Sequence, residues 1–173
     1  MKIAKFDYLV ESGEQILNGI ALSIICFSLG AALCCEFVLH EIPCRLCVLQ
    51  RIGLTLVGIG IALNLRFGCK SSHYGLVLLG SIGTGMVALR QIFLHVCPGS
   101  TGYGSEILGL HLYTWTAIAA ALSIVFVAAM IICRESPGKY DITGGVFCFI
   151  GILLLFSITF VNVIAIAWRY GLI

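Results

Sequence analysis

Two cysteines three residues apart, Cys44 and Cys47, are the residues of this chain best suited to do chemistry. Residues with this spacing lie on one face of a helix, so the sulfurs can reach each other and cycle between a dithiol and a disulfide. Pro43 suits the first position of a helix. Cys44 would then lie in the first turn, where unpaired N–H groups and the positive end of the helix dipole favour a thiolate. The spacing therefore predicts reversible thiol–disulfide exchange.

The composition of the chain indicates that a membrane surrounds these residues. Of its 173 residues, 60% are hydrophobic and only 10% are charged, whereas a soluble domain has roughly 45–50% apolar and about 25% charged residues. So few charges cannot coat a water-soluble domain, and most of the apolar surface must therefore face lipid. A formal net charge of +2 offers no basic surface for nucleic acid, so lipid is the only bulk partner that the composition predicts.

Five stretches are long and apolar enough to cross a bilayer. A spanning helix needs about 20 mostly apolar residues, because each backbone N–H and C=O must be satisfied within its own helix. The expected spans run from about 15 to 39, 44 to 67, 74 to 96, 111 to 133 and 146 to 167. The predicted fold class is thus an all-α membrane protein, a single transmembrane domain over residues 1–173 with four core helices and a fifth C-terminal helix. Small residues in the second and third spans should allow close helix packing, namely Gly58, Gly60, Gly80, Gly83 and Gly85.

The distribution of basic residues predicts an orientation. Most of the Lys and Arg at the ends of the spans or beyond them fall on one side of the membrane: Lys2, Lys5, Arg66, Lys70, Arg134 and Lys139. By the positive-inside rule this side is the cytoplasm. The N-terminus is then cytoplasmic, while the cysteine pair and the C-terminus lie on the opposite, oxidising side. The first span is longer than the 7–15 apolar residues of a signal peptide, so we expect it to be retained as an anchor.

An arginine lies one helical turn deeper than the cysteine pair. Arg51 follows Cys47 by four residues and Cys44 by seven, so all three share one helix face. A guanidinium at this depth is costly unless it has a partner, and an ionisable residue inside a membrane indicates a functional site by default. The sequence therefore predicts a partner for Arg51 near the two sulfurs.

The cysteine pair also has two simpler interpretations. A C-x-x-C can be half of a zinc site, and His40, His95 and Cys97 are expected on the same side of the membrane. However, the sequence has no second C-x-x-C, and neither histidine is in helical register with the pair, so no metal site is predicted. The other interpretation is a static disulfide. A bridge across three residues closes so little chain that it would add little stability, which favours reversible chemistry.

The residues around the pair resemble a known family. The segment Pro43-Cys44-x-Leu46-Cys47-x-x-Gln50-Arg51 is similar to the signature of the DsbB family. These bacterial inner-membrane enzymes reoxidise a periplasmic thioredoxin-like disulfide donor, DsbA, and pass the electrons to quinone. Two more stretches within about residues 19 to 133 are similar to the family: Ala88-Leu89-Arg90-Gln91 with His95 beyond, and Leu108-Gly109-Leu110 with Trp115 beyond.

The resemblance implies roles for individual residues. Cys44 and Cys47 would form the redox pair beside the quinone, and Arg51 would polarise a quinone carbonyl. A quinone, either ubiquinone or menaquinone, suits this arginine because it is flat and apolar and its oxygens gain negative charge on reduction. Arg90 and His95 are weaker candidates to line the same site or to relay protons. A packing or snorkelling role for Arg90 is an equal alternative.

Two features depart from the family. The family has a second cysteine pair in a long second outer loop, whereas this loop is short here and contains only Cys97. The partner could reduce the Cys44–Cys47 disulfide directly. Alternatively, Cys97 bonds transiently to one cysteine of that pair, or to one of the two at the outer end of the first span, Cys34 and Cys35. The fifth span is the second departure, and the sequence predicts no function for it.

The predicted function is a quinone-linked thiol:disulfide oxidoreductase of the bacterial inner membrane that reoxidises a periplasmic, DsbA-like dithiol protein. An alternative is a quinone reductase similar to vitamin K epoxide reductase, although the pair of that family lies at the end of its last core helix rather than at the start of the second. A transporter or structural membrane subunit without enzymatic activity is the third possibility. Midplane ionisable residues or broken helices would favour a transporter, and neither is evident in the sequence.

Overall fold

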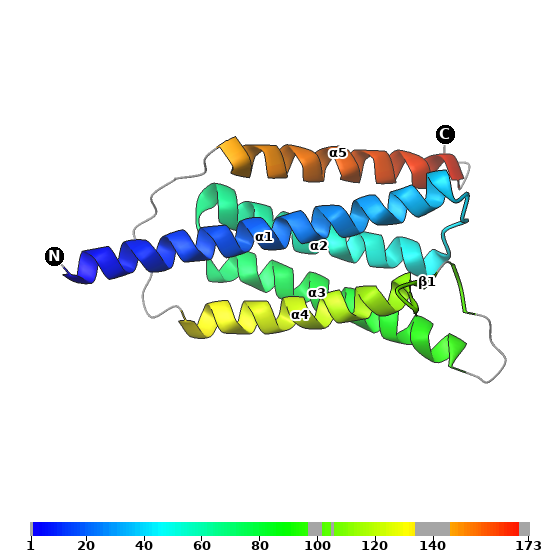
Figure 1. Ribbon diagram of the computed structural model, residues 1–173, viewed down its shortest axis with the longest axis horizontal. Helices are drawn as coiled ribbons and strands as arrows, with labels where there is room; N and C mark the ends of the chain where they lie inside the picture. The colour runs from blue at the N-terminus through cyan, green and yellow to red at the C-terminus, as the bar shows by residue number, and fades with distance from the viewer. Residues whose placement is uncertain (1, 97–101, 105, 134–145, 170–173) are drawn as a thin grey trace.

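The computed structural model describes residues 2–96, 102–104, 106–133 and 146–169 of the chain. Long helices make up most of these residues (Figure 1): α1 (Lys2–Val38), α2 (Arg45–Phe67), α3 (Ser71–His95), α4 (Leu112–Cys133) and α5 (Val146–Arg169). A short antiparallel hairpin, β1 (Glu106–Ile107) with β2 (Leu110–His111), precedes α4. Within these described ranges, five helices are long and apolar enough to cross a membrane, which confirms the predicted all-α membrane fold.

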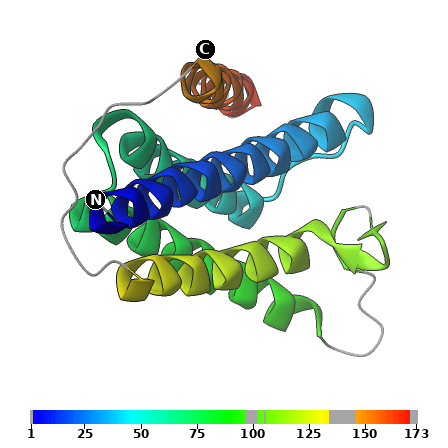
Figure 2. The same cartoon turned by 60° about the vertical axis from the view of Figure 1, so that its left-hand side comes forward.

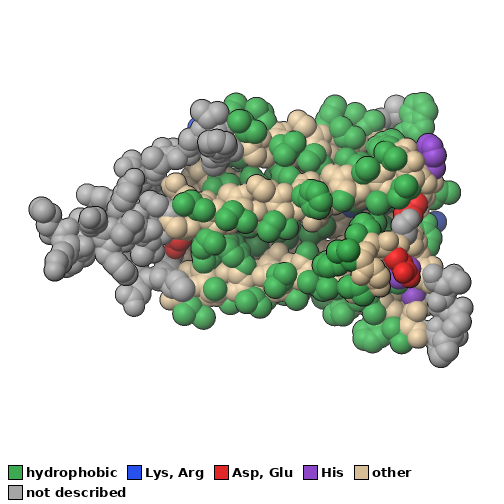
Figure 3. All heavy atoms as spheres, in the orientation of Figure 1, with side chains coloured by type: hydrophobic (Ala, Val, Ile, Leu, Met, Phe, Trp, Pro, Cys, Tyr) green, Lys and Arg blue, Asp and Glu red, His purple; other side chains and the backbone are tan. Residues whose placement is uncertain are grey.

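The helices pack in a defined order rather than around one central axis. The main packing contacts join α1 to α2, α2 to α3 and α3 to α4, while α5 packs on α1 and α2. Figures 1 and 2 show the same arrangement, with α5 and α4 on opposite sides of the bundle. Hydrophobic side chains cover much of the visible flank of the helices, and acidic and histidine side chains gather near the end of the bundle at the right of Figure 3. This distribution suits helices whose sides face lipid and whose ends face water.

The start of α2 differs from the expected position by a small but chemically relevant amount. The helix begins at Arg45, so Cys44 is its N-cap and Pro43 precedes the helix rather than occupying its first position. The backbone of Cys44 is extended, with φ −71° and ψ 159°, and its sulfur accepts a hydrogen bond from the N–H of Cys47 at 3.0 Å. The sulfur thus satisfies one of the N–H groups that the first turn of a helix leaves unpaired.

A polar network joins three helices at the end of the bundle opposite Cys44. The side chain of Asn18 on α1 donates to the hydroxyl of Tyr74 on α3 at 3.0 Å and accepts from Asn64 on α2 at 3.4 Å. All three side chains are almost completely buried. Arg66 and Lys70 lie at this same end, whereas Arg134 and Lys139, which also entered the predicted orientation, lie outside the described residues.

Glycines allow α2 and α3 to approach closely. A Cβ at Gly80 would lie 3.0 Å from the backbone N of Val57 and 3.1 Å from the carbonyl oxygen of Gly53. A Cβ at Gly60 would lie 3.0 Å from the backbone N of Val77. These distances are shorter than ordinary contacts, so the backbones of α2 and α3 meet only because side chains are missing there.

The other expected small residues have different surroundings. Gly58 packs on Leu155 of α5, where an added Cβ would come within 2.8 Å of the leucine side chain. Gly85 has ordinary space, with Ala120 at 3.5 Å from an added Cβ. Gly83 was expected to serve helix packing as well, but apart from the backbone of its own helix no described atom lies within 4 Å of its added Cβ, so this expectation is wrong.

Replacing Gly80 with alanine should destabilise the protein by about 1–3 kcal/mol, because the new Cβ is forced against the backbone of α2. Gly83→Ala, three residues along the same helix, should be neutral or slightly stabilising, because alanine favours helix more than glycine does. Reversible unfolding in detergent, followed by circular dichroism, measures both changes in the free energy of unfolding. Equal effects of the two substitutions would contradict the close approach of α2 and α3.

Candidate active site

The cysteine pair lies at the start of α2, at the end of the bundle where α1, α3 and α5 finish. Cys44 and Cys47 are joined by a disulfide, with their Cα atoms 5.1 Å apart. Both residues are partly buried, so the pair lies between the bundle interior and the surface. This arrangement gives one oxidised pair that is within reach of water and in contact with the membrane-spanning core.

A glutamine of α3 contacts this pair. The side-chain Nε2 of Gln91 donates a hydrogen bond to Sγ of Cys47 at 3.6 Å, and Gln91 itself is only 1% exposed. Its Oε1 accepts from Nε2 of Gln50, on α2, at 2.9 Å. The two amides therefore hold each other in place, and an N–H group directed at the sulfur can stabilise the negative charge that a thiolate carries. Both glutamines belong to the motifs quoted above, but the sequence alone assigned neither of them a role.

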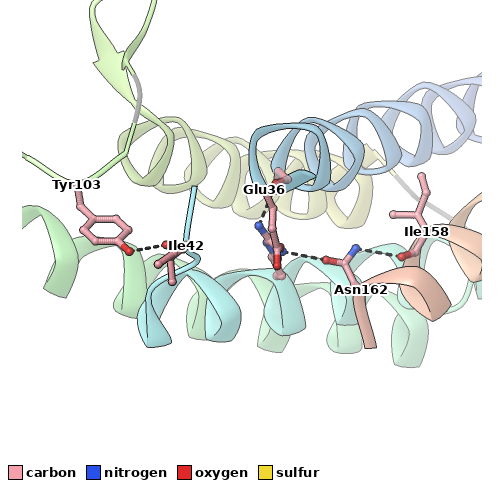
Figure 4. Close-up of polar contacts among 7 residues, drawn as sticks. Glu36, Ile42, Tyr103, Ile158 and Asn162 are labelled. Carbon is pink, nitrogen blue, oxygen red and sulfur yellow. Dashed lines mark hydrogen bonds and ion pairs between the residues drawn. The ribbon is translucent and has the colours of Figure 1, made fainter. Parts of the chain in front are cut away.

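Arg51 is buried among acceptors from two other helices. Its Nη1 donates to Oε2 of Glu36 on α1 at 2.5 Å and to Oδ1 of Asn162 on α5 at 3.4 Å (Figure 4). Its Nη2 donates to the carbonyl oxygen of Ala32 at 2.9 Å. The charge partner that the sequence required for this arginine is therefore a carboxylate of the same chain.

Sequence reasoning missed both Glu36 and Asn162. Glu36 could have been found, because a carboxylate near the end of an apolar span needs a partner for the same reason that Arg51 does. Asn162 gave weaker signal, since a single amide in a long apolar helix can also bond to its own backbone. Its Nδ2 does so, donating to the carbonyl oxygen of Ile158 at 3.0 Å.

A cavity of about 630 Å³ lies beside these residues, between α1 and α4. Cys47, Gln50, Arg51 and Gln91 contribute to its wall together with many apolar side chains. Phe27 of α1 also lines it and is 78% exposed, so the cavity opens toward the side of the bundle that lipid would cover. Its volume is in the range of small-molecule sites, and its lining of many apolar and few polar groups is typical of them.

The loop before α4 covers the outer end of the cavity. The hydroxyl of Tyr103 donates to the carbonyl oxygen of Ile42, just before the start of α2 (Figure 4). The indole N–H of Trp115 donates to the carbonyl oxygen of Ile107 at 2.9 Å, which ties the hairpin to α4. Tyr103, Ile107 and Trp115 all line the cavity. The covering segment is therefore anchored at both ends, beside the disulfide and on α4.

Arg90 and His95 lie differently from Gln91. The side chain of Arg90 is exposed in a shallow depression with Met86 and Phe93, and it is not part of the cavity wall. His95 is partly buried, and its Nδ1 lies 2.8 Å from the carbonyl oxygen of Gln91. Its ring stacks on that of Tyr113, a cavity residue, with 5.6 Å between the ring centroids. His95 therefore contacts a residue of the cavity wall without lining the cavity itself, and Arg90 faces away from the cavity.

Three other cysteines were candidates for passing electrons to the Cys44–Cys47 pair, and the structure describes two of them. Cys97 lies outside the described residues. Cys35 lines the cavity and Cys34 is exposed, and neither is in a disulfide. In the described part of the chain, no group of three or more His, Cys, Asp or Glu side chains could hold a metal ion.

Comparison with known proteins gives consistent matches to one family. Residues 14–103, just over half of the chain, match the family model described as disulfide bond formation protein DsbB. Disulfide bond formation protein B 1 of Pseudomonas fluorescens is 30% identical over 144 residues, which cover 62% of this chain and 84% of that protein. Disulfide bond formation protein B of Marinobacter nauticus is 29% identical over 157 residues, covering 69% of this chain and 92% of that protein. No solved structure gives a significant match.

The matched residues include the parts of the site that carry its chemistry. They contain the disulfide, Arg51 with its partner Glu36, and Gln91. The helix α5, with Asn162, lies beyond them. A disulfide at the head of a membrane-spanning helix, within a family match of this extent, identifies the chain as a member of the DsbB family of membrane disulfide bond formation proteins, which are oxidoreductases.

Proposed function

We propose that this protein oxidises a DsbA-like dithiol protein on the periplasmic side of a bacterial inner membrane and transfers the electrons to a membrane quinone. The observation that carries the proposal is the shared cavity wall. Cys47, Gln91 and Arg51 border one mostly apolar cavity that opens toward lipid, and the amide of Gln91 contacts the sulfur of Cys47. A lipid-soluble quinone matches this lining, because its ring is flat and apolar and its two oxygens are polar.

Thiol–disulfide exchange accounts for the first half of the reaction. A thiolate of the partner attacks one sulfur of the Cys44–Cys47 disulfide, which breaks and forms a mixed disulfide. The second thiol of the partner then displaces that sulfur, leaving Cys44 and Cys47 as a dithiol and the partner as a disulfide. When the dithiol closes again, it releases two electrons and two protons. A bound quinone would accept both electrons and both protons and leave as the quinol.

Arg51 is the residue proposed to hold a quinone oxygen. Three of the five N–H donors of its guanidinium are used by Glu36, Asn162 and Ala32. The other two have no partner among the described residues, and Arg51 borders the cavity. They can therefore donate to an oxygen that gains negative charge on reduction. Gln91 would act at the other reactant, stabilising the thiolate of Cys47 through its N–H.

A quinone acceptor also accounts for where the pair lies. A strongly oxidising donor disulfide has a potential near about −120 mV, and each 30 mV uphill costs about 1.4 kcal/mol for two electrons. An ordinary protein dithiol could not recharge such a donor, whereas a quinone pool coupled to respiration could. The orientation is part of the proposal, and it is supported by Arg66 and Lys70, which lie at the end of the bundle opposite the disulfide.

The route of electrons into the pair has two forms. The partner reduces the Cys44–Cys47 disulfide directly, or Cys97 first forms a transient bond with that pair or with a cysteine at the end of α1. The position of Cys35 on the cavity wall is compatible with the second form. A Cys97→Ser variant decides between them, since full activity excludes the relay and loss of activity supports it.

Turnover by the purified protein tests the proposal. A reduced DsbA-like protein and a short-chain water-soluble quinone are added, and the absorbance of the quinone is followed. Cys44→Ser and Cys47→Ser should each abolish turnover, because neither variant can form the disulfide. Cys26→Ala, a change at a buried thiol that is not in the cavity wall, should retain turnover and serves as the control. Activity in both serine variants would reject the assignment.

Neighbouring residues on α3 give a sharper test of the site geometry. Gln91→Leu keeps a similar volume but removes the N–H beside Cys47, so it should slow quinone reduction by about tenfold, the effect of losing one hydrogen bond to a charged group. Arg90→Gln should change the rate by less than about twofold, because Arg90 faces away from the cavity. Steady-state rates at saturating dithiol protein measure both effects. The reverse order would show that α3 is rotated relative to the structure described here.

A further inference from the structure

We infer that α5 supports the quinone site from outside the cavity wall, and that Asn162 is a positioning residue for Arg51. The inference rests on the proposed quinone reaction and extends it to a helix that lies beyond the residues matching the family. Asn162 is 4% exposed and comes from the helix that packs on both α1 and α2. It therefore reaches Arg51 from the opposite side of the bundle to α4.

The amide of Asn162 has a defined orientation. Its Nδ2 donates to the carbonyl oxygen of Ile158, one turn earlier on α5, at 3.0 Å. This bond uses the N–H side of the amide and leaves Oδ1 facing Nη1 of Arg51 at 3.4 Å (Figure 4). The side chain is thus fixed by its own helix as a neutral acceptor for the guanidinium.

The three acceptors together determine the plane of the guanidinium. Glu36 and Asn162 share Nη1 from two different helices, and the carbonyl oxygen of Ala32 holds Nη2. Because a guanidinium is planar and rigid, fixing both terminal nitrogens also fixes the direction of its remaining donors. Without Asn162, the two remaining acceptors, Glu36 and the carbonyl oxygen of Ala32, both belong to α1, so within this cluster the guanidinium would be held from α1 alone. The group could then shift with α1, which would move the remaining donors out of position for a ligand oxygen.

The two tryptophans of the chain make this effect measurable without turnover. Trp115 lines the cavity, whereas Trp168 is 76% exposed on α5. In a Trp168→Phe background, Trp115 is the only indole, and a short-chain benzoquinone bound in the cavity should quench its fluorescence. Titrating the oxidised protein in detergent with this quinone then gives a dissociation constant that does not depend on the thiol chemistry.

Asn162→Leu in this background should raise the dissociation constant of the quinone about fivefold, which corresponds to about 1 kcal/mol. Asn162→Ala also removes the acceptor but has a smaller side chain, and it should likewise raise the dissociation constant of the quinone. Thr159→Val is the matched control. The hydroxyl of Thr159 is buried one turn away on α5 without a hydrogen-bond partner among the described residues, so its removal should leave quinone binding unchanged.

The outcomes separate this inference from the proposed function. If quinone does not quench Trp115 in the parent protein, the proposed quinone site is wrong, and the role of Asn162 falls with it. If the parent binds quinone and both Asn162 variants bind it equally well, only the role of Asn162 is rejected. An equal loss of affinity in Thr159→Val would also reject it, because α5 would then act through packing alone. In turnover, the Asn162 variants should raise the KM for quinone and leave the rate of disulfide reduction by the dithiol protein unchanged.

Discussion

The buried ion pair between Arg51 and Glu36 constrains the outer half of this bundle. A single charge at this depth would cost several kcal/mol, and a pair is tolerated only where the geometry is close and further hydrogen bonds satisfy both groups. Those conditions bind α1, which carries Glu36 and Ala32, to α2, which carries Arg51, and α5 adds Asn162. The positions of α1, α2 and α5 along their axes are therefore fixed relative to one another at Arg51. The cavity gains a rigid wall at that point, and the disulfide begins one turn above it.

The cavity exists because α1 and α4 are not closely packed. A bundle in which these helices met would bury more apolar surface and would be more stable by that measure. Here α5 packs on α1 and α2 instead, so the far side of the site is closed while the space between α1 and α4 remains. Tyr103 and the hairpin before α4 cover the outer end. An apolar ligand would thus enter from lipid, while the disulfide stays accessible from water, and these are the two approaches that a membrane thiol oxidase needs.

The membrane fold and the cysteine site could be predicted because both depend on local patterns: the length of apolar stretches and the spacing of two cysteines. The contacts of Arg51 and Cys47 could not, because they depend on how far each helix is rotated about its axis. Arg90 and Gln91 illustrate the difference. Adjacent residues on a helix point about 100° apart, and charge alone favours Arg90 as the site residue. The contact of Gly80 with α2 fixes the rotation of α3, and in that rotation Gln91 meets Cys47 while Arg90 faces outward.

Because the side chain of Asn162 is uncharged, it can accept a hydrogen bond from Arg51 without changing the charge of the cluster. Glu36 already balances the charge of Arg51, so a second carboxylate at position 162 would give this cluster of side chains a net negative charge. That charge would oppose any ligand whose oxygens become negative on reduction. An amide supplies the hydrogen-bond acceptor that the second Nη1 donor requires without changing the charge of the cluster. The electron acceptor would then meet a guanidinium whose charge is balanced by Glu36 but which still has N–H donors to offer. The balanced charge lowers the free-energy cost of burying the guanidinium while the cavity is empty. The remaining N–H donors would still attract the oxygen of a reduced ligand.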